Sequence, residues 1–132
     1  MDVGNPSNFV RVLELFDKEF QSLKNVLSSY NISDDETRTV IKEVFLKNNY
    51  LLDPHGAVGY LGLKKYLDQH PQLQGIFLET AHPVKFYDVV EPIIQQSVAM
   101  PHAIKRLLDQ KKLSVKMGVE YKEFEEFLLN TV

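Results

Sequence analysis

Apolar residues recur every three to four positions along most of the chain, which is the spacing of a helix with one buried face. The first such stretch runs from Phe9 to Leu27, after a helix entry at residues 6–8 that contains a proline. This pattern predicts one long helix, or two helices with a break near Asp17.

A second helix is predicted to begin at Ser33. Glu36 lies three residues later, and this spacing is that of a capping box, in which the two side chains satisfy each other's free backbone N–H groups. The helical spacing continues to Asn48–Asn49, where we expect the helix to end.

The next segment predicts a strand, a helix and a second strand. Tyr50–Leu52 is a short apolar run typical of a buried strand, and it is followed by Asp53 as helix N-cap and Pro54 in the first turn. The helix is predicted to run to about Gln69, and Gly75–Leu78 predicts the second strand. A right-handed crossover would make the two strands parallel, giving a βαβ unit.

Three further helices complete the prediction. One covers Phe86–Ile94 with an interruption at Pro92, the next covers Pro101–Leu113, and the last covers Tyr121–Leu128 after a turn at Lys116–Gly118. The predicted fold class is α/β, predominantly helical, with a small βαβ parallel unit and surrounding helices. Since two parallel strands are marginal alone, we expect further structure to pair with them.

Length and composition are those of one folded domain over residues 1–132, with 44% apolar residues. The net charge of -3 leaves no basic face for nucleic acid. Without cysteine, disulfides and thiolate metal sites are excluded. The first residues do not resemble a signal peptide, and no apolar run approaches the ~18 residues of a membrane span. We therefore expect a cytoplasmic protein that binds neither nucleic acid nor membrane.

Two octapeptides carry the candidate chemistry: the first octapeptide, Asp53–Tyr60, and the second octapeptide, Glu79–Phe86. Each lies where a predicted strand ends and a helix begins, the place where α/β sheets hold ligands. The hydroxyl of Thr80 can donate to a ligand acceptor such as a pyridine nitrogen, or to a neighbouring carbonyl. Lys85 can serve as a catalytic amine, as a phosphate partner, or as a solvated lysine in a first helical turn.

Glycine recurs at positions 56, 59 and 62 of the helix that begins in the first octapeptide. Each glycine costs a helix about 1 kcal/mol relative to alanine, so a close approach of another backbone or of a ligand is expected there. The spacing is not the G-x-G-x-x-G of a dinucleotide site.

The histidines at positions 55 and 82 each adjoin a proline near a predicted helix start. With Asp53 they suggest a metal hydrolase, but no two of them share the helical spacing of metal ligands, and zinc takes three or four ligands. We expect no metal, and we expect Asp53 and His55 to serve as structural supports, with Asp53 as a helix cap.

Together the two octapeptides resemble the C-terminal part of threonine synthase, a pyridoxal-phosphate enzyme of fold type II. Met1-Asp2-Val3 and Pro6-Ser7-Asn8-Phe9 with Arg11 are similar to the family's segment before these motifs, so the resemblance runs from about residue 1 to about residue 128. Gly56 stands where the family often has threonine, Val84 where it usually has alanine, and Val10 where an acid is usual.

The resemblance implies conversion of O-phosphohomoserine and water to threonine and phosphate, a lyase reaction that uses pyridoxal phosphate. Thr80 matches the family's threonine at the pyridine nitrogen, while His82 and Lys85 match positions next to the site. The family's Schiff-base lysine and phosphate cup belong to an earlier part of the enzyme, and no lysine here matches that role. No catalytic residue is therefore assigned to this chain.

The chain is accordingly expected to be a C-terminal fragment, inactive alone, whose partner is the N-terminal portion of the same enzyme. Met1 would then match an internal methionine. This interpretation predicts exposed apolar surface and self-association. The alternative is a stand-alone helical α/β interaction or regulatory module, which predicts a covered sheet edge.

Overall fold

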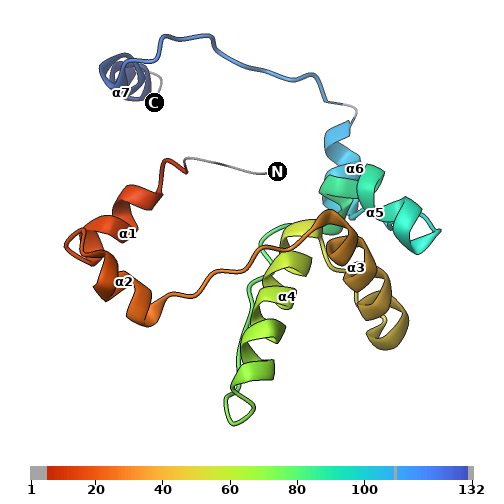
Figure 1. Cartoon of the computed structure of the whole chain (residues 1–132). Coiled ribbons are helices and arrows are strands. Elements are labelled where there is room, and N and C mark those ends of the chain that lie inside the picture. Colours follow the sequence, from red (N-terminus) through yellow and green to blue (C-terminus); the bar gives the residue numbers. More distant parts are fainter. Residues whose placement is uncertain (1–5, 109, 131–132) are drawn as a thin grey trace. The chain divides into compact units, whose positions relative to one another are not determined.

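The computed structural model describes residues 6–108 and 110–130, and their regular structure is entirely helical (Figure 1). The Met1-Asp2-Val3 run of the resemblance lies outside these residues. The chain divides into two compact units, Met1–Val98 and Ala99–Val132. The single domain over residues 1–132 stays a prediction.

The helices are α1 (Phe9–Leu15), α2 (Phe20–Val26), α3 (Asp34–Asn48), α4 (Pro54–Gln69), the 3-10 helix η1 (Pro83–Phe86), α5 (Tyr87–Ile94), α6 (His102–Leu108) and α7 (Tyr121–Asn130).

Asp17 and Lys18 separate α1 from α2 because both adopt left-handed backbone conformations, with φ of 51° and 59°. Two successive positive φ values end a right-handed helix. The N–H of Lys18 donates to the carbonyl of Leu13 at 2.7 Å and closes the turn. Of the two predictions for this stretch, the pair of helices is confirmed.

The predicted capping box of α3 is confirmed. Ser33 Oγ accepts from the Glu36 N–H at 3.3 Å, and the Ser33 N–H donates to Glu36 Oε2 at 2.8 Å. The pKa of Glu36 is lowered to about 2, first by the hydrogen bond from the Ser33 N–H. The Lys65 ammonium group, 2.9 Å from Glu36 Oε1, and the Ser33 hydroxyl also lower it. Asn49, with φ of 51°, ends the helix where the sequence predicted.

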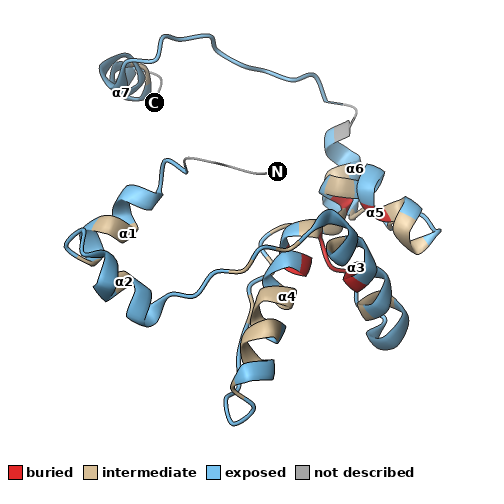
Figure 2. Cartoon of the chain, viewed as in Figure 1, coloured by how far each residue is buried: buried red, intermediate tan, exposed pale blue. Residues whose placement is uncertain are grey.

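The core of the first unit lies where α3, the start of α4 and α5 meet (Figure 2). Ile41 on α3 and Val90 on α5 are fully buried, as is Leu52 immediately before α4. Partly buried apolar residues surround this cluster, namely Val44, Leu51, Tyr60, Leu61, Phe77, Ile93 and Ile94. The core is small, so the start of α4 depends on a few apolar contacts and on its cap.

The predicted βαβ unit is wrong for the residues that the structure describes. Neither Tyr50–Leu52 nor Gly75–Leu78 forms a strand. A strand is defined by backbone hydrogen bonds to a neighbouring strand, and these segments have none to pair with in residues 6–108 and 110–130. Their apolar composition reflects burial of Leu52 and contacts with α4 instead.

Residues 75–79 run back along α4 in extended form (Figure 1). Gly75 faces Leu63, the Phe77 ring meets the Tyr60 ring edge-on at 5.6 Å, and Glu79 reaches the start of the helix. The intervening Ile76 and Leu78 are 91% and 77% exposed. The side chains of this segment therefore point alternately toward α4 and toward solvent, as side chains do along a strand.

Pro92 lies inside α5 and does not interrupt it, contrary to the prediction. Only two residues follow Pro92 in the helix, so the backbone hydrogen bond that its missing N–H removes lies near the end of the helix and costs little.

In the second unit, α6 ends at Leu108 and is shorter than predicted, whereas α7 forms where the sequence placed the last helix. The side chains of residues 110–120 are exposed, including Leu113 and Val119 at 88% and 98%.

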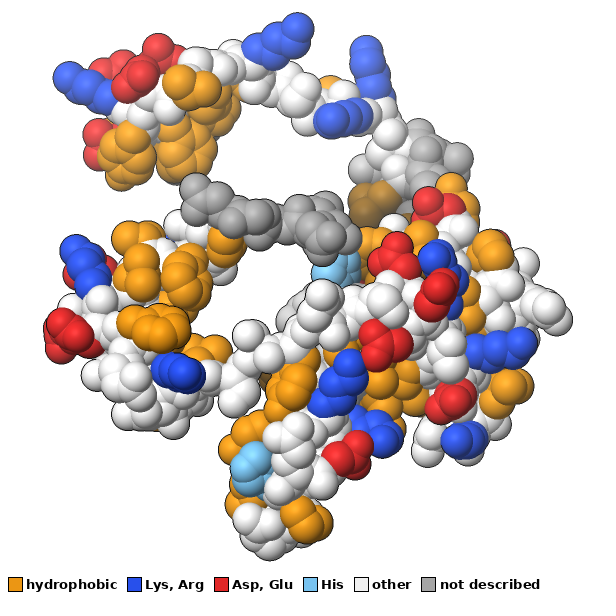
Figure 3. Space-filling model, viewed as in Figure 1, with side chains coloured by type: hydrophobic (Ala, Val, Ile, Leu, Met, Phe, Trp, Pro, Cys, Tyr) orange, Lys and Arg blue, Asp and Glu red, His pale blue; other side chains and the backbone are white. Residues whose placement is uncertain are grey.

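Many apolar side chains lie at the surface (Figure 3). Across residues 6–108 and 110–130, no helix combines the length and the apolar character that crossing a bilayer requires.

Replacing the capping serine, Ser33→Ala, is expected to lower the free energy of unfolding by about 1 kcal/mol, because the Glu36 N–H loses its acceptor at the start of α3. Urea unfolding followed by circular dichroism measures this change. Ser29→Ala, in the exposed segment after α2, is the control and should stay within about 0.5 kcal/mol of the parent chain. Equal effects of the two substitutions would contradict the assignment.

Candidate functional site

Asp53 joins the two octapeptides at the start of α4. Its side chain is fully buried, and Oδ1 accepts from the His55 N–H at 2.9 Å and from His55 Nδ1 at 3.1 Å. Its own N–H donates to Glu79 Oε1 at 2.7 Å. The predicted role of Asp53 as helix cap is confirmed, and His55 supports that cap.

Glu79 packs its carboxyl group directly over Gly56. A Cβ at position 56 would lie 2.5 Å from Glu79 Cδ, so the Glu79 carboxyl would have to move to make room for it. This close approach comes from a side chain, whereas the glycine series predicted the approach of another backbone or of a ligand. It holds at position 56 alone, because a Cβ at Gly59 would meet nothing within 4 Å and one at Gly62 only Tyr30 at 3.9 Å.

Burial raises the pKa of the Glu79 carboxyl. The Asp53 N–H opposes this rise, while the hydrogen bond that protonated Glu79 can share with the Asp53 side chain, and the charge of that side chain, add to it. Asp53 Oδ2 and Glu79 Oε2 are both buried and accept no hydrogen bond. Glu79 carries no local signal of this role in the sequence, since its partner Asp53 lies 26 residues earlier in the chain. The glycine at position 56 was the available signal.

Thr80 follows Glu79 directly and is exposed, in an irregular segment rather than at the end of a strand. His82 is the N-cap of η1, with Nδ1 accepting from the Val84 N–H at 3.1 Å, and it is exposed. Lys85 lies within η1 and is also exposed. The three predicted site residues therefore share one surface turn.

A second pair of residues fixes this turn to α4. Val84 is buried, and the Phe86 ring lies 5.0 Å from the His55 ring. Thr80 thus lies between two attachments to the start of α4, one through Glu79 and one through Phe86.

A metal site does not form around these residues. In the part of the chain that the structure describes, no group of three or more histidine and carboxylate side chains could hold a metal ion. Nδ1 of His55 is bound to Asp53, and Nδ1 of His82 is bound to a backbone N–H.

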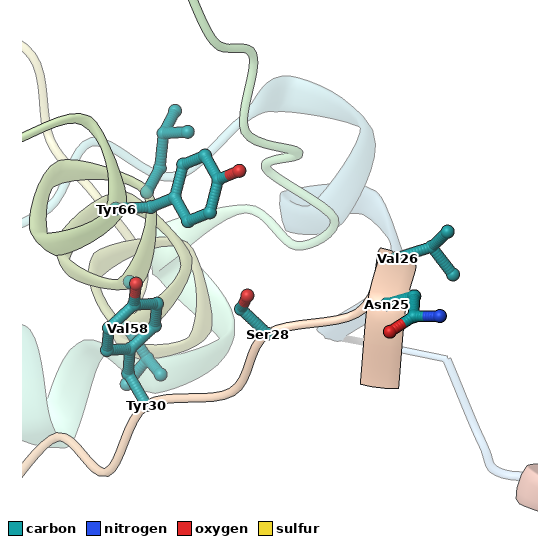
Figure 4. A pocket seen from close by; sticks show the side chains of 8 residues that line it. Asn25, Val26, Ser28, Tyr30, Val58 and Tyr66 are labelled. Atoms are coloured by element: carbon teal, nitrogen blue, oxygen red, sulfur yellow. The ribbon is translucent and has the colours of Figure 1, made fainter. Parts of the chain in front are cut away.

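A hollow of about 450 Å³ lies elsewhere in the first unit, between the end of α2, the following segment and α4 (Figure 4). Its lining consists of Asn25, Val26, Ser28, Tyr30, Val58, Gly62, Leu63 and Tyr66. It has no carboxylate, histidine or lysine, and none of the candidate site residues lines it.

Comparison with known proteins identifies the family. A family profile described as threonine synthase, C-terminal, matches residues 56–128. Threonine synthase of Buchnera aphidicola from Schizaphis graminum is 36% identical over 98% of the chain, and that of Escherichia coli is 33% identical over 98%. This chain belongs to the threonine synthase family.

Solved structures of the family agree with the fold. The crystal structure of threonine synthase from Escherichia coli matches all of the chain with a TM-score of 0.73 and 32% identity. The PLP-bound threonine synthase from Brucella melitensis matches 97% with a TM-score of 0.60 and 27% identity. The chain spans 29% of the length of the two sequence relatives and 30% of the Escherichia coli structure.

Thr80 is exposed, and its hydroxyl is a donor of the kind that the pyridine nitrogen of pyridoxal phosphate would accept. At the starts of α4 and η1, the His55 and Val84 N–H groups donate to the capping side chains of Asp53 and His82.

Asp53→Ala is expected to lower the free energy of unfolding by about 1 to 2 kcal/mol, because the buried start of α4 loses its cap. Asp53→Asn keeps an oxygen for the cap and adds N–H donors beside Glu79, so it should be at least as stable as the parent chain at neutral pH. Urea unfolding of both variants tests this, with Asp68→Asn on the exposed side of α4 as control. A loss in Asp53→Asn equal to that in Asp53→Ala would refute the capping account.

Proposed function

We propose that residues 1–132 act as one C-terminal portion of a threonine synthase, which converts O-phosphohomoserine and water to threonine and phosphate. The observation that carries this proposal is the family profile over residues 56–128, supported by relatives that match 98% of the chain. Bound pyridoxal phosphate supplies the electron sink for this lyase chemistry. The fold-type-II assignment and a cytoplasmic location are part of the same proposal.

Thr80 is the proposed cofactor contact. Its hydroxyl donates to the pyridine nitrogen, and because the hydroxyl is neutral it leaves that nitrogen less protonated than an aspartate would. Support comes from its exposure and from the two attachments that fix its turn to α4.

His82 and Lys85 lie next to the proposed contact. His82 orients the turn by capping η1, and Lys85 places an ammonium group at its exposed edge. We assign neither residue a covalent role, and no catalytic residue is proposed within this chain.

The chain alone is proposed to be inactive, since it spans 29% of its relatives' length and the resemblance implies that the lysine that bonds the cofactor lies in the earlier part of the enzyme. Its partner is the remaining, N-terminal portion of the enzyme. The exposed Ile76 and Leu78 fit this view, because a fragment separated from its partner portion is expected to expose apolar surface. Without the partner, the same surface would promote self-association.

Thr80→Val in the enzyme assembled with its N-terminal portion is expected to lower kcat roughly tenfold, because one hydrogen bond to the cofactor is lost while side-chain shape is kept. Thr80→Ser restores the hydroxyl and should recover most of the rate. Steady-state kinetics with O-phosphohomoserine measure both. A Thr80→Val enzyme as fast as the parent would reject the contact.

The chain by itself, mixed with pyridoxal phosphate and treated with borohydride, is expected to show no stoichiometric attachment at a single lysine. Peptide mass spectrometry gives the readout, and Escherichia coli threonine synthase treated identically is the positive control. Complete labelling of one lysine in this chain would overturn the proposed division of roles.

A further inference from the structure

The carboxyl group of Glu79 occupies the space that a side chain at position 56 would fill. It lies over Gly56, whose added Cβ would come within 2.6 Å of Glu79 Oε1. A threonine at position 56 would take the space that the Glu79 carboxyl now fills. Positions 56 and 79 therefore form a complementary pair in which the larger side chain comes from position 79.

The hydrogen bonds around this pair are incomplete when both acids are ionised. Glu79 Oε1 accepts from the Asp53 N–H at 2.7 Å, and Asp53 Oδ1 accepts from His55. Asp53 Oδ2 and Glu79 Oε2 are buried acceptors without a donor. A single proton on Glu79 would supply the missing donor, since a protonated carboxyl has one O–H.

This anchor lies immediately before the turn of the proposed cofactor contact. Residues 75–79 follow α4 from Leu63 back to Asp53, and Glu79 is the last of these contacts before Thr80. Movement of the Glu79 carboxyl would therefore shift Thr80 directly.

We propose that Glu79 is a positioning residue for Thr80, its protonated carboxyl seated against Gly56 and hydrogen-bonded to Asp53. This inference rests on the proposed function for the part that concerns the cofactor. The anchor itself depends only on the chain.

The first test is a double-mutant cycle on the chain with Gly56→Thr, Glu79→Ser and the double variant. Gly56→Thr should destabilise the chain by a clash with Glu79, and Glu79→Ser should destabilise it by leaving an empty space. The double variant should recover part of the lost stability. We expect the unfolding equilibrium constant of the double variant, measured by urea unfolding, to be roughly tenfold smaller than additive effects of the two single substitutions imply. Additive effects would overturn the complementary pair.

The second test does not need Gly56→Thr to fold. Glu79→Gln keeps the shape and donates an N–H to Asp53 at any pH, whereas Glu79→Ala removes the anchor. The stabilisation from protonated Glu79 should be fully present below its ordinary pKa of 4.5 and be lost as pH rises through the raised pKa. The titratable groups around it are Asp53 and, bound to Asp53, His55.

We therefore expect parent stability to fall relative to Glu79→Gln as pH rises. Carbon NMR of the glutamate carboxyl groups should show one signal, absent from Glu79→Gln, that titrates above the others. A Glu79 signal that titrates with the exposed glutamates would overturn the proton assignment.

The assembled enzyme links the anchor to the cofactor. Glu79→Ala should shift the absorbance of bound pyridoxal phosphate in the same direction as Thr80→Val, and Glu79→Gln should restore it. Parent-like absorbance in Glu79→Ala would reject the positioning role. An assembled parent enzyme without activity on O-phosphohomoserine would reject the proposed function, whereas the cycle and the NMR titration would still decide the anchor.

Discussion

The hydrogen bond from the Asp53 N–H to the Glu79 carboxyl is the contact on which the arrangement of the two octapeptides depends. It joins residues 26 apart in the chain and brings the two octapeptides to one end of α4. The same aspartate caps that helix, so the cap, the returning segment and the turn of Thr80 share one attachment point. A change at any of the three would be transmitted to the other two.

The turn that contains Thr80, His82 and Lys85 is attached to α4, but these three residues are exposed. Val84 is buried and Phe86 meets His55, while Thr80, His82 and Lys85 remain exposed. A fixed backbone with exposed polar groups is what a binding surface requires, since little entropy is then lost on contact.

In residues 6–108 and 110–130, helices form and the two predicted strands do not. Helices satisfy their backbone hydrogen bonds internally, so α3 and α4 need only caps and one buried face. Residues 75–79 adopt extended backbone and alternate as a strand would, yet Ile76 and Leu78 lie exposed. The family's solved relatives are about three times as long, and this chain matches 30% of the Escherichia coli structure.

Local signals in the sequence determined the capping box at Ser33, the Asp53 cap of α4 and the ends of α3, because each depends on residues within a few positions of one another. The family could likewise be inferred from the two octapeptides, because each is a contiguous run of residues. Only the tertiary structure decided that Glu79 meets Gly56 and Asp53, and that the predicted strands stay unpaired, because both depend on which distant segments meet. Sequence periodicity specifies which side chains can be buried; it does not specify the partner that buries them.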